Sequence, residues 1–400
     1  MIRFLTAGES HGPALTAIVE GFPAGLPLTL EAIQTDLDRR RQGYGRGGRM
    51  QIEGDQAEIL SGVRQGYTLG SPLTLQIRNR DWERWQAVMA VAAGAGPEQV
   101  AIAADRQLTA IDAVVTKPRP GHADLAGALK YRQTDIRNIL ERASARETAA
   151  RVGVGAVARR LLQEFGVVVF SGVLQIGTVT VTNLPEDLSS YQRQVAASAV
   201  ATPDPEATAL MTAEIDRAKQ AGDSLGGVIE VLAAAVPVGL GSHVHWERRL
   251  DARLAGALMS IPAIKGVEVG LGFQTAGMAG SLVHDPIAYD DAKGFYRTTN
   301  NAGGIEGGIS NGEVIRLRMA MKPIPTLYQP LPTVDLITKQ VASAGVERSD
   351  TCAVPAAAVV AEAMVCWVLA EAFLEKFGGD HLQETRSNYE AYRRHLRRDA

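Results

Sequence analysis

Two histidines stand in turns whose composition suits acid–base chemistry. His11 lies within Gly8-Glu9-Ser10-His11-Gly12-Pro13, and His122 follows Pro118-Arg119-Pro120-Gly121. An imidazole changes charge near neutral pH, so a positioned histidine can donate or accept a proton. The two prolines prevent a helix from starting before His122, because proline lacks an N–H and disfavours helical geometry in its predecessor. We expect both histidines to face a ligand; a plain surface turn for His11 and a polar helix cap for His122 are the alternatives.

A second group of residues is suited to binding anions. Thr29–Arg41 has apolar residues at helical spacing, and Gly43-Tyr44-Gly45-Arg46-Gly47-Gly48-Arg49 follows it. Arginine binds phosphate and carboxylate through paired donors. The GxGxxG pattern in this loop follows a helix and precedes the strand-like Met50–Leu60, the reverse of the dinucleotide-binding order. We therefore expect a loop that closes over an anionic ligand; a solvated basic loop and an RNA contact are the alternatives.

Glycine is densest in Asn300–Gly312, where backbone N–H groups can approach a flat or phosphorylated ligand closely. A flexible loop is the alternative for this segment. It leads into the alternating strand Glu313–Met321 and then into Lys322-Pro323-Ile324-Pro325-Thr326, a strand end of the kind that often carries function. Arg348–Thr351 precedes Pro355–Phe377, which is apolar nearly all round and is therefore expected to be a central helix.

The remaining periodicities predict a mixture of helices and strands. Helices are expected at Ala123–Leu140, Ser144–Phe165 and Glu247–Ser260, and over Gln192–Ala221, where Asp204-Pro205 opens a second helical segment. Strands are expected at Ile52–Val63, Ser71–Ile77, Val167–Val181, Val228–Val236 and Lys265–Phe273. Ser144 and Glu147 have capping-box spacing at the start of the second helix. Asp81–Arg106 carries little periodic signal, and we expect a surface excursion there.

Composition limits the class of protein. The chain has 400 residues, of which 46% are hydrophobic and 21% charged, and its net charge is −3, so any anion site must be a local cluster. Cys352 and Cys366 are expected to be free thiols in a reducing compartment. The chain begins without the features of a signal peptide, and Glu362 and Glu371 interrupt the apolar run Val354–Leu374. We expect a cytoplasmic protein with no membrane contact.

No metal site is expected. His243 and His245 share a strand face by alternation, but no cysteine or carboxylate at suitable spacing accompanies them.

Taken together, the motifs resemble the signatures of the chorismate synthase family. The resemblance rests on Gly8–Gly12, Arg119–Asp124, Arg142–Thr148, Asp223–Gly227, Asn300–Gly312, Lys322–Thr326 and Arg348–Asp350. The family forms chorismate from 5-enolpyruvylshikimate-3-phosphate by 1,4-anti-elimination of phosphate, and it requires reduced FMN without net redox change. The resemblance implies an α/β (α+β) fold with a helical layer sandwiched between antiparallel-rich sheets, and a homotetramer. We expect a catalytic domain over residues 1–379 and a charged, helical tail over 380–400.

The resemblance also implies a role for each motif residue. His11 would give a proton to the departing phosphate, His122 would protonate or stay near the reduced flavin, and Asp350 would assist proton removal from the substrate near flavin N5. The anionic groups of the substrate would be bound by Ser10, Arg40, Arg46, Arg49, Arg119, Arg146 and Arg348.

The same resemblance implies a set of FMN contacts. They are Arg142, Ala143, Ser144, Pro262, Ala263, Gly307, Lys322, Pro323, Ile324, Pro325, Thr326 and Arg348. Pro262 stands where the family often has an amide side chain, so this contact is expected from the backbone. NADPH, as an indirect reductant, would use Arg40 and Arg46 if it binds, and an external flavin reductase is the other expected source of electrons. Residues 85–106 fit the family pattern poorly but lie outside every motif.

Two other functions are consistent with parts of the pattern. An FMN-dependent oxidoreductase would use the same flavin site, but the sequence offers no credible nicotinamide site beside it. A nucleic-acid-binding protein would use the Gly/Arg loop, but that loop occurs once and the net charge is acidic. We therefore expect a small-molecule substrate and no nucleic acid.

Overall fold

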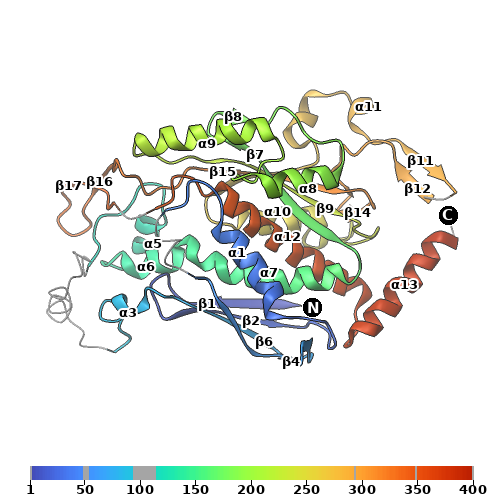
Figure 1. Cartoon of the computed structure of the whole chain (residues 1–400), viewed down its shortest axis with the longest axis horizontal. Helices are drawn as coiled ribbons and strands as arrows, with labels where there is room; N and C mark the ends of the chain where they lie inside the picture. Colours follow the sequence, from blue (N-terminus) through green and yellow to red (C-terminus); the bar gives the residue numbers. More distant parts are fainter. Residues whose placement is uncertain (1, 48–53, 93–113, 292–293, 347–348, 399–400) are drawn as a thin grey trace.

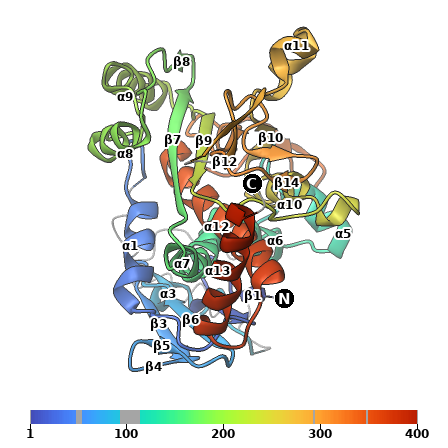
Figure 2. The same ribbon diagram turned by 90° about the vertical axis from the view of Figure 1, so that its right-hand side faces the viewer.

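A helical layer lies between two antiparallel sheets (Figure 1). The computed structural model describes residues 2–47, 54–92, 114–291, 294–346 and 349–398. The layer consists of the helices α1 (Leu30–Arg41), α7 (Thr148–Gln163) and α12 (Val354–Phe377). Figure 2 shows α7 and α12 between β1 and β6 on one side and β7 and β9 on the other. This arrangement confirms the α+β fold with a sandwiched helical layer in a single domain.

The first sheet has four antiparallel strands. Their order is β1 (Arg3–Ala7), β2 (Ala14–Glu20), β6 (Leu73–Arg78) and β3 (Ala57–Ser61). Leu73, Leu75 and Ile77 alternate with less buried residues in β6, so one face of the sheet packs on the helices. The turn between β1 and β2 carries His11, as predicted.

The second sheet has five strands, and helices cover its other face. Its order is β10 (Ile264–Val269), β15 (Ile315–Met321), β9 (Gly227–Ala234), β7 (Val168–Ile176) and β8 (Val179–Thr180). The covering helices are α8 (Leu188–Ala197) and α9 (Pro205–Gln220), which lie on the side of β7 away from α12 (Figure 2). Asp204 caps α9 by accepting hydrogen bonds from the first-turn N–H groups of Glu206 and Ala207.

Further helices and four hairpins lie outside the layer and the two large sheets. The helices are α3 (Trp82–Trp85), α5 (Asp124–Tyr131), α6 (Arg137–Ala143), α10 (Leu250–Met259), α11 (Gly280–Val283) and α13 (Leu382–Arg398). The hairpins are β4 (Val63–Arg64) with β5 (Tyr67–Thr68), β11 (Ile287–Asp290) with β12 (Gly294–Arg297), β13 (Ile305–Glu306) with β14 (Ile309–Ser310), and β16 (Pro332–Val334) with β17 (Val341–Ser343).

Helix α12 forms the centre of the core. It is long and apolar enough to cross a membrane, but 89% of its most apolar window is buried inside the protein. It packs closely on α7 because Gly155 faces Ala363, where an added Cβ would lie 2.3 Å from the alanine Cβ.

The middle of α12 carries a fully buried carboxylate, Glu362. Both terminal nitrogens of Arg39 donate to it at 2.8 Å, and Arg159 Nη2 and Ser171 Oγ each donate at 2.6 Å. Burial favours the neutral acid, but the two guanidinium groups outweigh it and lower the pKa of Glu362 to about 2. The carboxylate therefore joins α1, α7, β7 and α12 at one point.

Two local predictions were wrong. The expected helix Ala123–Leu140 is divided into α5 and α6, because Arg132 adopts a left-handed conformation with φ of 54° and ends α5. The expected capping box does not form. Ser144 Oγ accepts from Arg146 N at 3.3 Å, Glu147 pairs with Arg151, and a 3₁₀ turn over Ala145–Glu147 precedes α7.

The expected strand over Ile52–Val63 is shorter in the structure, and part of it is not described. The strand covers only Ala57–Ser61, because Gly62 turns the chain with φ of 83° into the hairpin of β4 and β5. Part of the expected excursion over Asp81–Arg106 also lies outside the described residues, but its start forms α3.

We predict that Glu362→Gln lowers the free energy of unfolding by about 3–5 kcal/mol, because two partly buried guanidinium groups lose the fully buried carboxylate that both of them bind. Glu371→Gln is the matched control on the same helix. Glu371 pairs with Arg253 at 2.8 Å but is partly exposed, so its loss should cost less than about 1 kcal/mol. Urea unfolding followed by circular dichroism measures both. Equal losses in the two variants would contradict the central role of Glu362.

Candidate active site

A cavity of about 470 Å³ lies where the ends of many elements meet. Its walls come from the β1–β2 turn, the loop after α1, the α6–α7 junction, the end of β15 and the start of α12. Part of the lining is apolar: Leu140, Ile261, Pro262, Ala263, Met321, Ile324, Pro325, Ala353, Ala356, Ala357 and Val360. The rest includes two histidines and five cations: His11, His122, Arg40, Arg46, Arg119, Arg146 and Lys322. Such a lining suits a ligand that combines a flat apolar part with several negative charges.

His11 is held by a buried carboxylate. Glu141 lies on α6 with its side chain 2% exposed, and its two oxygens lie 2.9 and 3.0 Å from His11 Nδ1. The backbone N–H of His11 also donates to Glu141 at 2.8 Å, and Arg137 donates to the same carboxylate at 3.2 Å. Burial alone would raise the pKa of Glu141, but the hydrogen bonds from His11 and the charge of Arg137 outweigh it and lower that pKa.

His122 belongs to a second cluster, centred on Asp124 at the start of α5. Asp124 contacts His122 Nδ1, accepts from Arg119 Nε at 2.8 Å, and accepts from the Arg119 backbone N–H at 3.0 Å. Arg119 also donates to Thr326 Oγ1 at 3.3 Å. Although Asp124 is buried, these partners hold its pKa below the usual range. The cluster therefore fixes a charged guanidinium and an imidazole side by side, and Arg119 Nη2 lies 3.1 Å from His122 Nδ1.

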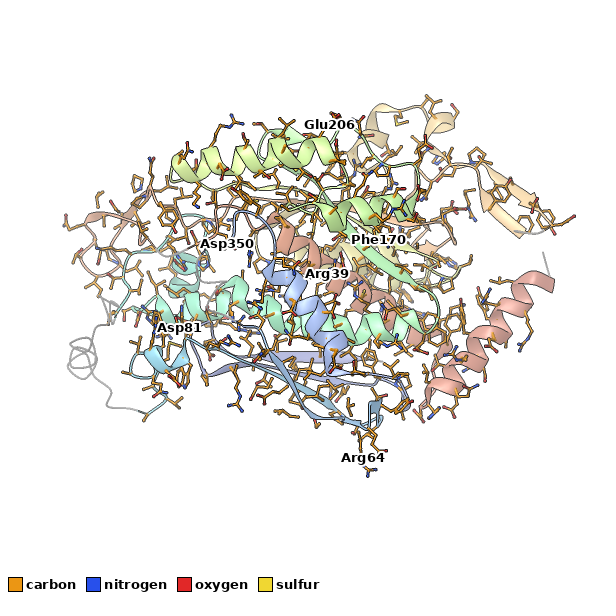
Figure 3. The ribbon with its side chains drawn as sticks, in the orientation of Figure 1. Arg39, Arg64, Asp81, Phe170, Glu206 and Asp350 are labelled. Carbon is orange, nitrogen blue, oxygen red and sulfur yellow. The ribbon has the colours of Figure 1, made fainter. Side chains whose placement is uncertain are left out.

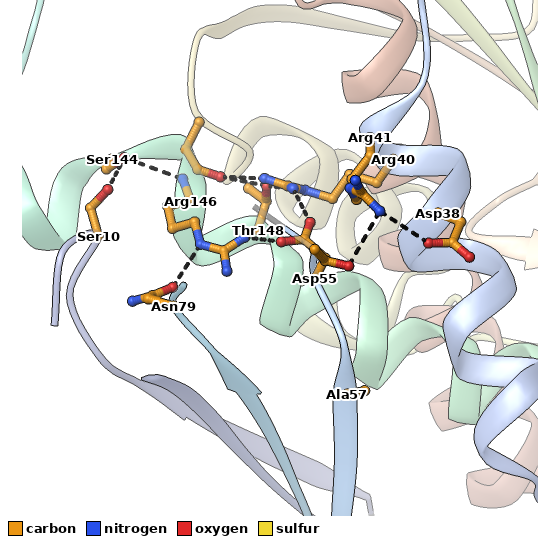
Figure 4. Close-up of polar contacts among 12 residues, drawn as sticks. Ser10, Asp38, Arg40, Arg41, Asp55, Ala57, Asn79, Ser144, Arg146 and Thr148 are labelled. Atoms are coloured by element: carbon orange, nitrogen blue, oxygen red, sulfur yellow. Dashed lines mark hydrogen bonds and ion pairs between the residues drawn. The ribbon is translucent and has the colours of Figure 1, made fainter. Parts of the chain in front are cut away.

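Two arginines share one fully buried carboxylate, Asp55 (Figure 4). Arg40 donates to Asp55 at 3.0 Å, and Arg146 donates to its other oxygen. Arg146 Nε also donates to Asn79 at 2.9 Å, and Arg40 Nε donates to Thr148 at 3.1 Å. Burial lowers the pKa of Arg40 to about 10 despite Asp55, so its guanidinium stays charged at neutral pH. One carboxylate against two guanidinium groups leaves net positive charge at the cavity.

The loop after α1 is tied to the segment before α12. Arg46 pairs with Asp350 at 2.7 Å, and the backbone N–H of Gly47 donates to Asp350 at 2.6 Å. The N–H of Thr351 donates to the carbonyl of Gly45 at 2.9 Å. Figure 3 places the Asp350 label toward the same end of the molecule as Asp81. These bonds hold Asp350 at the cavity wall beside a cation.

The structure brings most of the predicted site residues into this one lining. They are Ser10, His11, Arg40, Arg46, Arg119, His122, Ala143, Ser144, Arg146, Pro262, Ala263, Lys322, Ile324, Pro325 and Asp350. Pro323 and Thr326 flank the lining without entering it, although Thr326 supports Arg119. Arg49 and Arg348 lie outside the described residues.

Two predicted flavin contacts lie elsewhere. The Arg142 side chain is directed to the β1 end, where it donates to the carbonyls of Thr6 at 3.0 Å and Gly8 at 3.1 Å. Gly307 occupies the turn of the β13–β14 hairpin and does not line the cavity. Arg142 precedes Ala143, which does line the cavity.

Sequence patterns missed the residues that orient the predicted ones. They are Asp55, Asn79, Trp85, Asp124 and Glu141. Asp124 and Glu141 had a usable signal, because each belongs to or adjoins a predicted motif and a buried arginine or histidine needs an anionic partner. Trp85 had none, because it lies 74 positions from His11, yet its indole stacks on that imidazole at 3.9 Å between ring centroids.

The lining is compatible with FMN in this cavity. The apolar residues at the end of β15 and the start of α12 suit a planar ring system, and Lys322 and the arginines suit a phosphate. Pro262 has no N–H and no polar side chain, so its carbonyl is the only hydrogen-bonding group that it can offer.

Comparisons with known proteins identify the family of the chain. The family model described as chorismate synthase matches residues 2–374. The chain is 60% identical to the chorismate synthase of Moorella thermoacetica over 400 residues, covering 99% of both chains. It is 57% identical to that of Geobacter metallireducens over 404 residues, covering 99% of this chain and 100% of the relative. A crystal structure of a chorismate synthase superposes with a TM-score of 0.78 at 46% identity, covering 99% of this chain and 98% of that one.

Proposed function

The chain belongs to the chorismate synthase family, and we propose that its reaction takes place in the cavity that contains His11, His122 and Asp350. The enzyme is a carbon–oxygen lyase of the shikimate pathway that forms chorismate by 1,4-anti-elimination of phosphate from 5-enolpyruvylshikimate-3-phosphate. Family membership favours this function over an FMN-dependent oxidoreductase or a nucleic-acid-binding protein. One observation carries the assignment of the site, namely that two carboxylate-bound histidines and five cations line a single cavity.

Substrate binding is proposed to depend on the arginines. The substrate has two carboxylates and a phosphate, and burying these charges is costly unless fixed cations meet them. Arg40, Arg46, Arg119 and Arg146 line the cavity and are themselves oriented by carboxylates. We propose that Arg49 and Arg348 add to this set, and that Ser10 contributes its hydroxyl group.

We propose the proton transfers that the family resemblance implies for His11, Asp350 and His122. As the carbon–oxygen bond to phosphate breaks, its electron pair stays with the phosphate oxygen, and His11 donates a proton to that oxygen. Asp350, beside Arg46, assists removal of the proton from the substrate carbon. His122, held by Asp124, lines the same cavity, where it would face the flavin and keep its own proton available.

Reduced FMN is the proposed cofactor, and when bound it supplies electron density transiently to the substrate. The residues that would hold it in the cavity are Ala143, Ser144, Pro262, Ala263, Lys322, Ile324 and Pro325. Arg142 would contribute through its backbone, and Pro323 and Thr326 would shape the same loop. The proposed contacts of Gly307 and Arg348 rest on the family resemblance alone.

The remaining assignments follow from the family resemblance. We propose a cytoplasmic homotetramer with a catalytic domain over residues 1–379 and a helical tail over 380–400. Arg40 and Arg46 line the proposed substrate cavity, so NADPH bound there would compete with the substrate. We therefore propose that NADPH acts indirectly, through an external flavin reductase.

The proposed function predicts the stoichiometry of the reaction. Purified protein under anaerobic conditions with reduced FMN should release one phosphate for each chorismate formed from 5-enolpyruvylshikimate-3-phosphate. A colorimetric assay measures the phosphate, and absorbance measures the chorismate. Oxidised FMN serves as the inactive control. Absence of phosphate release with the reduced cofactor would refute the proposed function.

The proposed proton transfers predict the effect of replacing each of the two histidines. His11→Ala and His122→Ala should each lower kcat by roughly 10²–10⁴-fold, the usual contribution of a positioned acid or base. His243→Ala is the matched control, because His243 is exposed and lies outside the cavity lining, so its kcat should be unchanged. A near-normal kcat for His11→Ala or His122→Ala would remove that residue from the mechanism.

A further inference from the structure

The imidazole of His11 is restrained on two sides by residues that no motif contains. Glu141 accepts from its Nδ1 at 2.9 Å and from its backbone N–H at 2.8 Å. Trp85 stacks on its ring with centroids 3.9 Å apart and planes inclined by 26°. The His11 side chain is only 13% exposed, although His11 belongs to a loop between two strands. The ring therefore has a defined position and a defined rotation about its side-chain bonds.

The Glu141 contact determines which nitrogen faces the reaction. A carboxylate only accepts hydrogen bonds, so Nδ1 must carry a hydrogen whether the ring is neutral or charged. Of the described residues, none is hydrogen-bonded to Nε2. Since His11 lines the cavity, that nitrogen is available to a ligand bound there. A charged His11 can then lose its Nε2 proton without breaking the bond to Glu141. No rotation of the ring is needed between the two states.

Trp85 is itself fixed in place. Its Nε1–H donates to Asp81 Oδ2 at 3.1 Å, and the guanidinium carbon of Arg137 lies 5.0 Å from its ring centroid. Arg137 also donates to Glu141, so the carboxylate and the indole share one cation. The imidazole, the indole, the carboxylate and the guanidinium thus form one connected cluster, which we call the His11 clamp.

We propose that Glu141 and Trp85 are positioning residues that hold His11 as a proton donor with Nε2–H directed at the leaving phosphate. This inference rests on the proposed role of His11. In the step, the Nε2–H bond breaks, the proton passes to the phosphate oxygen that receives the electron pair of the carbon–oxygen bond, and His11 is left neutral with its hydrogen on Nδ1. No other reactant is required.

The charges around His11 indicate how its protonation should respond to mutation. Glu141 is the only carboxylate within hydrogen-bond distance of the ring among the described residues. Arg137 from α6 and the cations of the cavity oppose a positive imidazole. The other charged or titratable groups of the lining are Arg40, Arg46, Arg119, His122, Arg146, Lys322 and Asp350. Replacing Glu141 by an uncharged residue should therefore make His11 lose its proton at lower pH.

The first test needs neither flavin nor substrate. In ¹⁵N spectra of the histidine rings of the full chain, neutral His11 should be the Nδ1–H tautomer. In Glu141→Gln it should titrate about one pH unit or more below its position in the unmodified protein. His122, which is bound to Asp124, is the internal reference and should not move. An Nε2–H tautomer in the unmodified protein, or an unchanged titration in Glu141→Gln, would overturn the inference even if His11 proves catalytic.

The second test measures turnover with reduced FMN. Glu141→Gln should lower kcat by roughly 10–100-fold with little change in KM, the range seen when the orienting partner of a metal-bound histidine is removed. The alkaline limb of its pH profile should also move to lower pH. A purely structural role would scale the whole profile down and leave that limb in place, which would contradict the proposal.

The role of Trp85 is tested with two substitutions of Trp85 and one control substitution of Trp82. Trp85→Ala should lower kcat about threefold to tenfold through loss of the stacked ring, and Trp85→Phe should restore most of it. Trp82→Ala, in the same short helix, is the control and should leave kcat unchanged. Equal effects of Trp85→Ala and Trp82→Ala, or no recovery with phenylalanine, would show that stacking on His11 does not matter.

Discussion

Each arginine of the cavity forms an ion pair with a carboxylate of the protein, and this pairing makes its burial possible. Removing a guanidinium from water costs several kcal/mol unless an anion compensates. At the cavity, Asp55 compensates two arginines, Asp124 one and Asp350 one. The carboxylates are fewer than the cations that they orient, so each side chain is fixed while the cavity stays positive. An anionic substrate therefore finds cations that are already ordered, and binding does not have to supply the cost of ordering them.

The same constraint connects the core to the site. Arg39 and Arg40 are neighbours in α1, but one turns inward to Glu362 and the other toward Asp55 and the cavity. Glu362 fixes α1 against α7 and α12, and the cavity is built at the ends of α1 and α12 and at the junction before α7. A shift of α1 relative to its neighbours would move Arg40 and the Arg46 loop together. The interior ion cluster thus sets the geometry of residues that it does not contact.

The sequence predicted the elements and the chemically active residues better than their partners. Periodicity located α1 and α12 because α1 buries one stripe of side chains and α12 buries nearly all of its surface. Motifs located His11, His122 and the arginines because Gly and Pro mark unusual backbone beside reactive side chains. The division of Ala123–Leu140 was missed because the residue in the left-handed conformation is Arg132 and not glycine, the residue type that usually marks the end of a helix. Asp55 was missed because a single carboxylate in a loop has no periodic signature.

Trp85 shows why residues that orient a functional group are difficult to predict from the sequence. Its effect on His11 depends on α3 and the β1–β2 turn meeting in space, and no spacing along the chain encodes that meeting. Tryptophan at an unpatterned position is usually explained by packing, and the packing here is real. The difference lies in what it packs against, because an indole face stabilises a neighbouring cation as well as an apolar group. Trp85 lies outside every motif of the sequence, yet its ring stacks on the proposed proton donor. Motifs are therefore a poor guide to which residues orient a functional group.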